Sequence, residues 1–339
     1  MKTDLNGSVF VYMYYLCIST PNPTTLKDLK ISIIGAGNVG ATAATAIAQK
    51  ELCNQLVLLD IRKGIAEGKA LDMWQSSPLA LYDTRSIGVT DDFSATADSQ
   101  IVVITSGSPR KPGQNREDLV SMNARIVHHV TRNVMQYSPN AIILVVSNPL
   151  DVMAYCAYLT AQCDRSKVIG MAGLLDTARY RAFIADAVNC SVKDIQAVTM
   201  GGHGDTMVPL PRYTTVSGVP LNQFLDDETI HQICERTRHG GGELVNLMGT
   251  SAWVAPGLAT ARMVESIVLD QRRILPCSVY LDGEYGIKDI FFGVPVKLGR
   301  NGVEQILEIE LNDEERAMVD QSAISVKETT DLFRNMKLF

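Results

Sequence analysis

The sequence predicts an α/β fold in which a doubly wound parallel sheet precedes a second domain of α+β type. Three observations predict it. Short apolar runs alternate with helix-like stretches from Lys30 onward, a glycine-rich turn follows the first of these runs, and the runs become alternating after about Asp176. Continuous apolar runs separated by helices are typical of parallel strands that are covered on both faces.

The first half is expected to contain five buried strands with helices between them. The expected strands span 30–34, 56–60, 101–105, 141–146 and 167–170. The expected helices span 39–50, 64–76, 118–137 and 151–162. The glycine-rich turn precedes the first helix, and Asn148-Pro149 precedes the last, both suitable positions for a helix to start.

The second half is expected to combine long helices with half-buried antiparallel strands, because its apolar residues alternate with polar ones. The expected strands span 195–200, 278–281, 291–296 and 303–309, and a closing helix spans 312–336. We therefore expect three segments: an N-terminal extension (1–29), a nucleotide-binding domain (30–172) and an α+β domain (173–339). The boundary need not be a flexible hinge.

Charge and cysteine usage exclude several classes of protein. The net charge of −6 argues against a nucleic-acid partner, since phosphate backbones are held by clustered basic residues. The seven cysteines are scattered, odd in number and never spaced C-x-x-C, which indicates reduced thiols in a cytoplasmic protein. His231, Cys234 and His239 lie close in sequence but lack a nearby fourth ligand, so we expect no metal site.

The first 29 residues have a pattern of their own. Their apolar run from Val9 to Ile18 is too short to span a bilayer, and no membrane partner is expected. The segment also lacks the strongly basic start and the small-residue cleavage site of a signal peptide. We interpret it as a mobile extension, with a targeting segment as the less favoured alternative.

A glycine motif at the first strand-to-helix turn predicts a dinucleotide site. The turn reads Gly35-Ala36-Gly37-Asn38-Val39-Gly40. In such a Rossmann-type turn the first glycine permits the tight turn, the second lets the backbone approach a pyrophosphate, and the third lets helix and strand pack closely. The helix N-terminus then offers free amides to the phosphates.

Asp60 indicates which dinucleotide is bound. It ends the next expected strand, twenty residues after Gly40, where a carboxylate can accept hydrogen bonds from the adenosine ribose hydroxyls. The same charge would repel the 2′-phosphate of NADP, so NAD is the expected cofactor. Arg62 and Lys63 leave dual use open.

Three further segments carry a family resemblance: Ser108 to Arg116, Leu175 to Arg179, and Gly201-Gly202-His203-Gly204-Asp205. At these residues the chain resembles the lactate/malate dehydrogenase family, and within it the malate dehydrogenases of lactate-dehydrogenase-like type. The resemblance covers roughly residues 30 to 335. It implies a reversible, NAD-dependent oxidation of (S)-malate to oxaloacetate by hydride transfer.

The resemblance also implies the roles of the reacting residues. His203 would accept the hydroxyl proton of the substrate and return it in the reverse direction, a role that suits a group titrating near neutral pH. Asp176 would orient the His203 ring and stabilise its protonated form, and Arg179 would hold the substrate carboxylate through two charged hydrogen bonds. A surface ion pair between Asp176 and Arg179 is the alternative interpretation.

The loop before residue 117 is expected to choose the substrate. Arg116 matches the family arginine that closes over the substrate, and Arg110 matches the position that selects its side group. An arginine there suits a second carboxylate, hence a dicarboxylate such as malate, because enclosing it against a methyl group would leave a charge unpaired. A solvated basic loop is the alternative.

Asn148 matches a family residue that contacts both the substrate and the nicotinamide. Asn123 matches one near the cofactor. We also expect Val146 and Ser147, which precede Asn148 in the motif at 146–151, to bind the cofactor.

Two other functions remain open. The first is a lactate or other 2-hydroxy acid dehydrogenase, with the same mechanism and a different side pocket. The second is a non-catalytic dinucleotide-binding scaffold, which the presence of all the acid–base and arginine residues disfavours. The resemblance also implies a homodimer or homotetramer, for which Ile65, Leu71, Met73 and Trp74 offer an apolar contact face.

Overall fold

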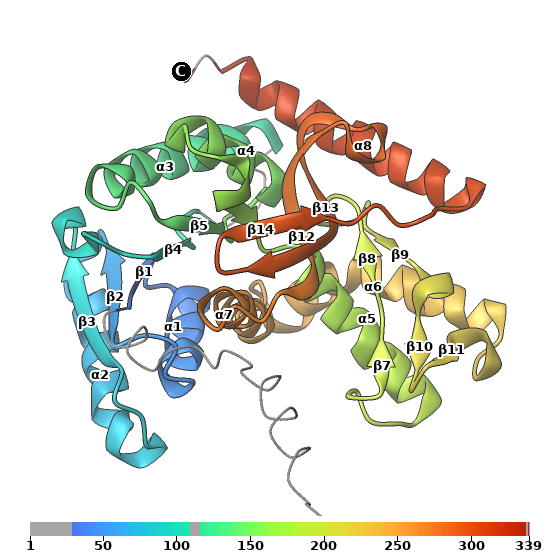
Figure 1. The fold of residues 1–339 in the computed structure, drawn as a ribbon, viewed down its shortest axis with the longest axis horizontal. Helices are drawn as coiled ribbons and strands as arrows, with labels where there is room; N and C mark the ends of the chain where they lie inside the picture. Colours follow the sequence, from blue (N-terminus) through green and yellow to red (C-terminus); the bar gives the residue numbers. More distant parts are fainter. Residues whose placement is uncertain (1–28, 109–115, 337, 339) are drawn as a thin grey trace, which may run out of the picture.

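The computed structural model describes residues 29–108, 116–336 and 338 (Figure 1). Almost all of the expected N-terminal extension, and Arg110, therefore lie outside the described residues. Arg116 is the first residue of a helix, but its side chain is not described.

A nine-stranded sheet runs through the molecule in the order β14-β13-β12-β6-β5-β4-β1-β2-β3. Its first-half strands are all parallel and follow the doubly wound order. They are β1 (Lys30–Ile34), β2 (Gln55–Asp60), β3 (Arg85–Thr90), β4 (Ile101–Ile104), β5 (Ile142–Val145) and β6 (Val168–Gly170). Four of the predicted strands thus differ from those observed by a residue at one or both ends, and one matches.

The sequence prediction missed β3. Its residues alternate only weakly, and Gly88 interrupts them. The glycine is needed because a Cβ there would lie 2.2 Å from the carbonyl oxygen of Ala66. Helix α2 (Ile65–Ala80) therefore packs directly on the backbone of this edge strand.

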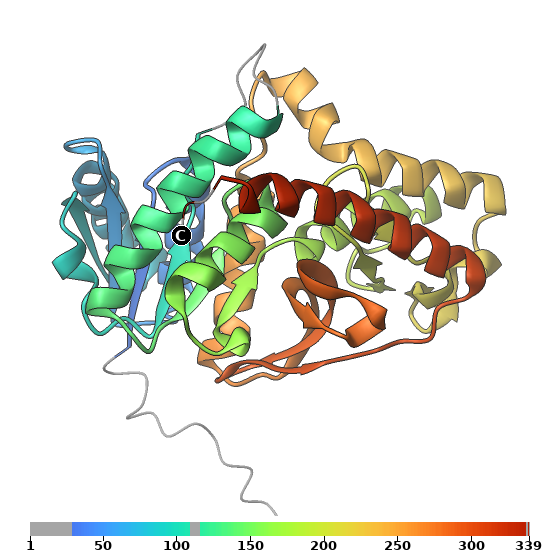
Figure 2. The ribbon, with the colours of Figure 1, turned by 90° about the horizontal axis from the view of Figure 1, so that it is seen from above.

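Helices cover both faces of the parallel strands (Figures 1 and 2). The first-half helices are α1 (Asn38–Gln49), α2, α3 (Arg116–Tyr137) and α4 (Leu150–Ala161). The second-half helices are α5 (Gly173–Val188), α6 (Asp227–Met248), α7 (Val254–Val268) and α8 (Asp313–Arg334). Asn312 caps α8 in a capping box with Glu315, so the closing helix is confirmed with slightly shorter bounds.

Three antiparallel strands extend the parallel sheet: β12 (Arg273–Asp282), β13 (Lys288–Gly299) and β14 (Gly302–Ile306). The join is the pairing of Ser278 on β12 with Gly170 on β6. The antiparallel prediction is confirmed for this hairpin. The prediction of half burial is wrong for β12 and β13, because their central residues are buried on both faces. Helices α4, α5, α7 and α8 all pack against this hairpin.

The expected strand at 195–200 is also wrong as a single element. It splits into β7 (Ile195–Gln196) and β8 (Thr199–Met200), which belong to different small sheets. Ile195 packs in the apolar cluster beside α5, whereas Met200 packs in the main core, so the chain crosses from one cluster to the other. β8 pairs with β9 (Val208–Pro209), whereas β7 pairs with β10 (Thr215–Val216), which in turn pairs with β11 (Val219–Pro220).

The two halves are packed together through α1 and α7, which lie side by side near the centre of Figure 1. Gly257 of α7 sits against α1, where a Cβ would lie 2.7 Å from the side chain of Thr42 and 3.0 Å from the backbone nitrogen of Ala43. A glycine at this point lets the two helices approach closely. The cofactor turn, which leads into α1, is thereby fixed against the second half.

Replacing this glycine tests the packing. We expect Gly257→Val to lower the free energy of unfolding by about 1–3 kcal/mol, because the added carbons overpack the α1–α7 contact. The measurement is urea unfolding followed by circular dichroism. Ala317→Val, which adds bulk at an exposed position of α8, is the control and is expected to cost about 0.5 kcal/mol. Equal losses in the two variants would contradict the packing argument.

Candidate active site

His203 lies on the glycine-rich loop between β8 and β9, facing the start of α5. Its Nδ1 atom is 2.9 Å from Oδ2 of Asp176, in the first turn of that helix. The structure therefore brings together two residues that the sequence separates widely. Because Nδ1 is engaged by the carboxylate, the other ring nitrogen is the one left for a reactant.

Arg179 completes this cluster one helical turn after Asp176. Its Nη1 atom donates to Oδ1 of Asp176 at 3.2 Å. The two side chains do pair, but Arg179 is only 15% exposed and Asp176 only 2%. Burial therefore disfavours the alternative of a surface ion pair. Among the described residues Asp176 is the one acceptor of Arg179, so further guanidinium donors remain for a ligand.

The surroundings favour the protonated form of His203. Burial by itself lowers the pKa of the imidazole, but the Asp176 carboxylate opposes this through its charge and its hydrogen bond. Asp151 acts in the same direction as Asp176, and Arg179 in the opposite one. The net effect is a raised pKa of His203, so the ring is well able to hold a proton near neutral pH.

Acceptors on three different elements hold the backbone of the His203 loop. Gly201 N–H donates to the carbonyl of Gly293 on β13, and Gly202 N–H donates to Oγ of Ser322 on α8. The N–H of His203 itself donates to Oδ2 of Asp151, near the start of α4. Sequence reasoning missed these contacts: it treated Asp151 only as a helix-start residue, and no local pattern marks Ser322.

Glycines of α6 lie beside Arg179. A Cβ at Gly240 would lie 3.4 Å from Cδ of Arg179, and one at Gly241 would lie 3.9 Å from its Nη1. At Gly242 a Cβ would meet nothing within 4 Å. The distances at Gly240 and Gly241 are ordinary van der Waals distances, so the contacts with Arg179 do not by themselves require glycine at these positions.

The glycine turn at the end of β1 has the shape that the sequence predicts. Gly35 has φ +113°, and a Cβ there would lie 2.6 Å from Oγ1 of Thr105. A Cβ at Gly40 would lie 1.9 Å from the carbonyl oxygen of Gly35, so α1 packs directly on the turn. At Gly37 a Cβ would meet no protein atom within 4 Å. This glycine therefore keeps open space in front of α1, whose first two residues are Asn38 and Val39.

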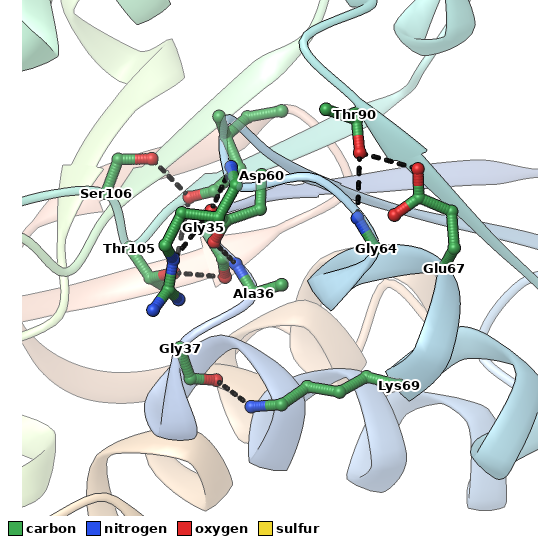
Figure 3. A network of polar contacts seen from close by, with 12 residues as sticks. Gly35, Ala36, Gly37, Asp60, Gly64, Glu67, Lys69, Thr90, Thr105 and Ser106 are labelled. Carbon is green, nitrogen blue, oxygen red and sulfur yellow. Dashed lines mark hydrogen bonds and ion pairs between the residues drawn. The ribbon is translucent and has the colours of Figure 1, made fainter.

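Asp60 fastens the turn to β2, as Figure 3 shows. Its Oδ2 accepts the N–H of Ala36 at 2.8 Å, and its Oδ1 accepts the backbone and side-chain N–H of Arg62. Burial raises the pKa of Asp60, but the hydrogen bonds with Arg62 and Ala36 outweigh it and leave this pKa below its ordinary value. The carboxylate is thus ionised and has lone pairs left for sugar hydroxyls.

A cleft of about 650 Å³ opens beside this turn. It runs from Gly35, Gly37 and Asp60 to the loop after β4, and its other wall is formed by Phe93 and the face of α3. Sequence reasoning missed the wall residues, which have no motif of their own: Phe93, Arg125, Ile126 and His129.

Asn123 and Asn148 lie together where the loop after β4 meets the turn after β5. The amide of Asn123 donates to the backbone carbonyl of Asn148 at 2.6 Å, and its oxygen accepts the N–H of Ser108 at 2.8 Å. Ser147 is tied to the same loop through the carbonyl of Ser106. Val146 is buried and continues the hydrogen bonding of β5 to Ile104.

The site residues therefore gather at one edge of the parallel sheet, beyond the carboxyl ends of its strands, where ligands bind in doubly wound folds. A family model for the NAD binding domain of lactate/malate dehydrogenase matches residues 29–170, and a model for the alpha/beta C-terminal domain of the same family matches residues 174–335. The chain belongs to the lactate/malate dehydrogenase family.

Named relatives agree with this family. The malate dehydrogenase of Cytophaga hutchinsonii is 59% identical over 304 residues, which cover 90% of this chain and 97% of that protein. A structure of malate dehydrogenase from Salinibacter ruber is 50% identical with a TM-score of 0.87, covering 91% of this chain and 99% of that one. A Cryptosporidium parvum lactate dehydrogenase, complexed with lactic acid and nicotinamide adenine dinucleotide, is 36% identical with a TM-score of 0.87, covering 91% of this chain and 99% of that one.

The residues present fit the NAD that this domain binds. The open space at Gly37 faces the free amides of α1, as a pyrophosphate requires, and the Asp60 carboxylate stands where ribose hydroxyls would be held. The cleft continues past both groups.

Metal ligation, disulfide bonding and membrane spanning can each be checked in the described residues. In this part of the chain no three histidine, cysteine or acidic side chains converge as a metal site, and the six described cysteines are unpaired. Among residues 29–108 and 116–336, no helix has the length and apolar character needed to cross a membrane.

Two glycine substitutions separate ligand space from packing. We expect Gly37→Val to weaken NADH binding at least tenfold, about 1.4 kcal/mol, because its side chain would fill the open space. It should change the free energy of unfolding by less than about 0.5 kcal/mol. Gly40→Ala should instead destabilise the fold by about 1–3 kcal/mol, because its Cβ meets the turn. The measurements are NADH fluorescence titration and urea unfolding; an unchanged NADH affinity in Gly37→Val would contradict the assignment.

Proposed function

We propose that this chain is a malate dehydrogenase, which catalyses the reversible, NAD-dependent oxidation of (S)-malate to oxaloacetate. The observation that carries the reaction type is the buried cluster of His203, Asp176 and Arg179. It combines a proton carrier, a carboxylate that orients it and a cation for a substrate carboxylate. The choice of malate is supported by the relatives of 51–59% identity that are named malate dehydrogenase.

His203 is the proton carrier in this proposal. In the neutral ring the nitrogen facing Asp176 carries the proton, so Nε2 can accept the proton of the malate hydroxyl. Bound NAD supplies the acceptor for the hydride, which leaves the carbon that bears this hydroxyl. The resulting imidazolium is stabilised by Asp176, and in the reverse direction it returns the proton to the carbonyl oxygen of oxaloacetate.

Arginines would hold the substrate. Arg179 would bind the carboxylate next to the reacting carbon through its remaining donors. Two further arginines are assigned from sequence alone: Arg116 would approach the carbonyl oxygen where negative charge develops, and Arg110 would bind the second carboxylate. Asn148 would contact both substrate and nicotinamide.

The cofactor would lie along the glycine turn. The turn residues from Gly35 to Gly40 would hold the pyrophosphate, Asp60 the adenosine ribose, and Asn123 with Val146 and Ser147 the nicotinamide end. Of the domains inferred from sequence, 30–172 would then supply the cofactor cleft and 173–339 the cluster of His203, Asp176 and Arg179.

We also infer a cytoplasmic homodimer or homotetramer. Exposed apolar side chains on α2 and α7, among them Leu71 at 55%, Leu79 at 86% and Leu258 at 51%, support a subunit contact. The sequence prediction placed Met73 on that surface as well. This is wrong, because Met73 is 7% exposed and packs inward.

Substrate choice is tested by the rates with oxaloacetate and pyruvate at matched NADH. We expect kcat/KM for oxaloacetate to be higher by at least 100-fold, about 2.7 kcal/mol, because a methyl group would leave Arg110 unpaired. Arg110→Gln should lower the oxaloacetate value far more than the pyruvate value. A wild-type preference for pyruvate would indicate a lactate dehydrogenase, and an equal loss on both substrates would show that Arg110 is not the selector.

The carboxylate partner is tested by Asp176→Asn. We expect kcat to fall by roughly 100-fold to 10,000-fold, because the amide neither stabilises the imidazolium nor fixes the correct ring tautomer. The pKa of His203 should fall as well, since a neighbouring negative charge is lost. Asp186→Asn, an exposed position on the same helix, is the matched control and should leave kcat within about twofold. A small loss in Asp176→Asn would refute the assigned role.

A further inference from the structure

A second buried carboxylate holds the backbone of His203. Asp151 is 6% exposed, and both of its oxygens accept hydrogen bonds. Oδ2 accepts the N–H of His203 at 2.9 Å, and Oδ1 accepts Oγ–H of Ser278 at 2.6 Å. A buried carboxylate with two donors from different elements is a costly arrangement that a helix start alone does not require.

The position of Asp151 in the chain links two parts of the proposed site. It stands in the first turn of α4, three residues after Asn148, and Ser278 lies on β12 where the two halves of the sheet join. Its bond to His203 therefore ties the loop of the proton carrier to the turn that carries Asn148.

The charges around His203 are unequal. Asp176 has Arg179 as a partner, whereas within the described part of the chain no lysine or arginine lies within ion-pair distance of Asp151. The titratable groups that face His203 are Asp176 and Arg179 on α5 and Asp151 on α4. Among the side chains that the structure describes, the protonated ring is thus the cation available to Asp151.

We propose that Asp151, held by Ser278, is a positioning residue of the dehydrogenase reaction: it fixes the backbone of His203 and favours the protonated state of its ring. This proposal rests on the proposed function of His203. It assigns no contact between Asp151 and the substrate.

Asp151 and His203 each affect the pKa of the other. Burial raises the pKa of Asp151 and outweighs its hydrogen bonds with Ser278 and His203, so this pKa lies above its ordinary value. In turn, the charge of Asp151 raises the pKa of His203, by less than the Asp176 carboxylate does. Loss of the Asp151 charge should therefore make the imidazole easier to deprotonate.

The first test is Asp151→Asn, which keeps the shape and one acceptor oxygen but loses the charge. We expect the pKa of His203 to fall by about one pH unit. The limb of the pH profile of kcat/KM that reports His203 should move to lower pH in both directions of reaction. Oxaloacetate reduction, which needs the protonated ring, should then fail at a lower pH, whereas malate oxidation should persist to a lower pH.

Two serine variants separate charge from loop support. Ser322→Ala removes the hydrogen bond to Gly202 on the same loop without touching a charge, so it should lower kcat but leave the limb in place. Ser278→Ala removes a donor that favours ionised Asp151, so the limb should move in the same direction as in Asp151→Asn and by less. Ser278→Ala also serves if Asp151→Asn does not fold, as judged by NADH fluorescence titration.

A measurement without catalysis keeps this proposal distinct from the proposed function. The imidazole Cε1–H signal of His203, assigned by its loss in His203→Asn, can be titrated by NMR in the wild type and the variants. A lower pKa in Asp151→Asn than in the wild type supports the proposal even if no substrate is turned over. An unchanged pKa together with an unmoved limb overturns it, even if the enzyme is an active malate dehydrogenase.

Discussion

The hydrogen bond between Asp176 and His203 is the interaction on which the rest of the site depends. It joins the first turn of α5 to a loop of the second half, and it does so where Asp176 is 2% exposed. In such surroundings the carboxylate strongly favours the protonated imidazole, because the ring is poorly solvated. The histidine is thereby oriented with one nitrogen free and with a raised pKa, the two properties that reversible proton transfer requires.

The fold supplies the rigidity that this pair needs. One sheet continues from the NAD-binding half into the hairpin of β12 and β13, and the hairpin carries two of the anchors of the site, Ser278 and Gly293. Helices α4 and α5 start at neighbouring ends of β5 and β6, so Asp151 and Asp176 face the same loop. A site built on the ends of packed strands and helices holds its geometry better than one on long loops.

Much of this architecture could be predicted from the sequence. Continuous apolar runs marked the parallel strands, and Gly35, Gly37 and Gly40 marked the cofactor turn because each glycine answers a local steric need. Burial of β12 and β13 on both faces could not be predicted from alternation, since it depends on helices that arrive from elsewhere. The pairing of Asp176 with His203 spans 27 residues, and it was expected only through the family resemblance. Asp151 was missed because a buried acceptor at a helix start has the same local pattern as a cap.

The most direct measurement is a crystal structure of the protein with NADH and an unreactive dicarboxylate analogue of oxaloacetate. The account predicts that Nε2 of His203 lies within hydrogen-bond distance of the analogue's carbonyl-like oxygen while Nδ1 stays on Asp176. It also predicts that Arg179 and Arg110 each bind one carboxylate. An analogue bound with His203 turned away from it, or with Asp176 separated from the ring, would contradict the account.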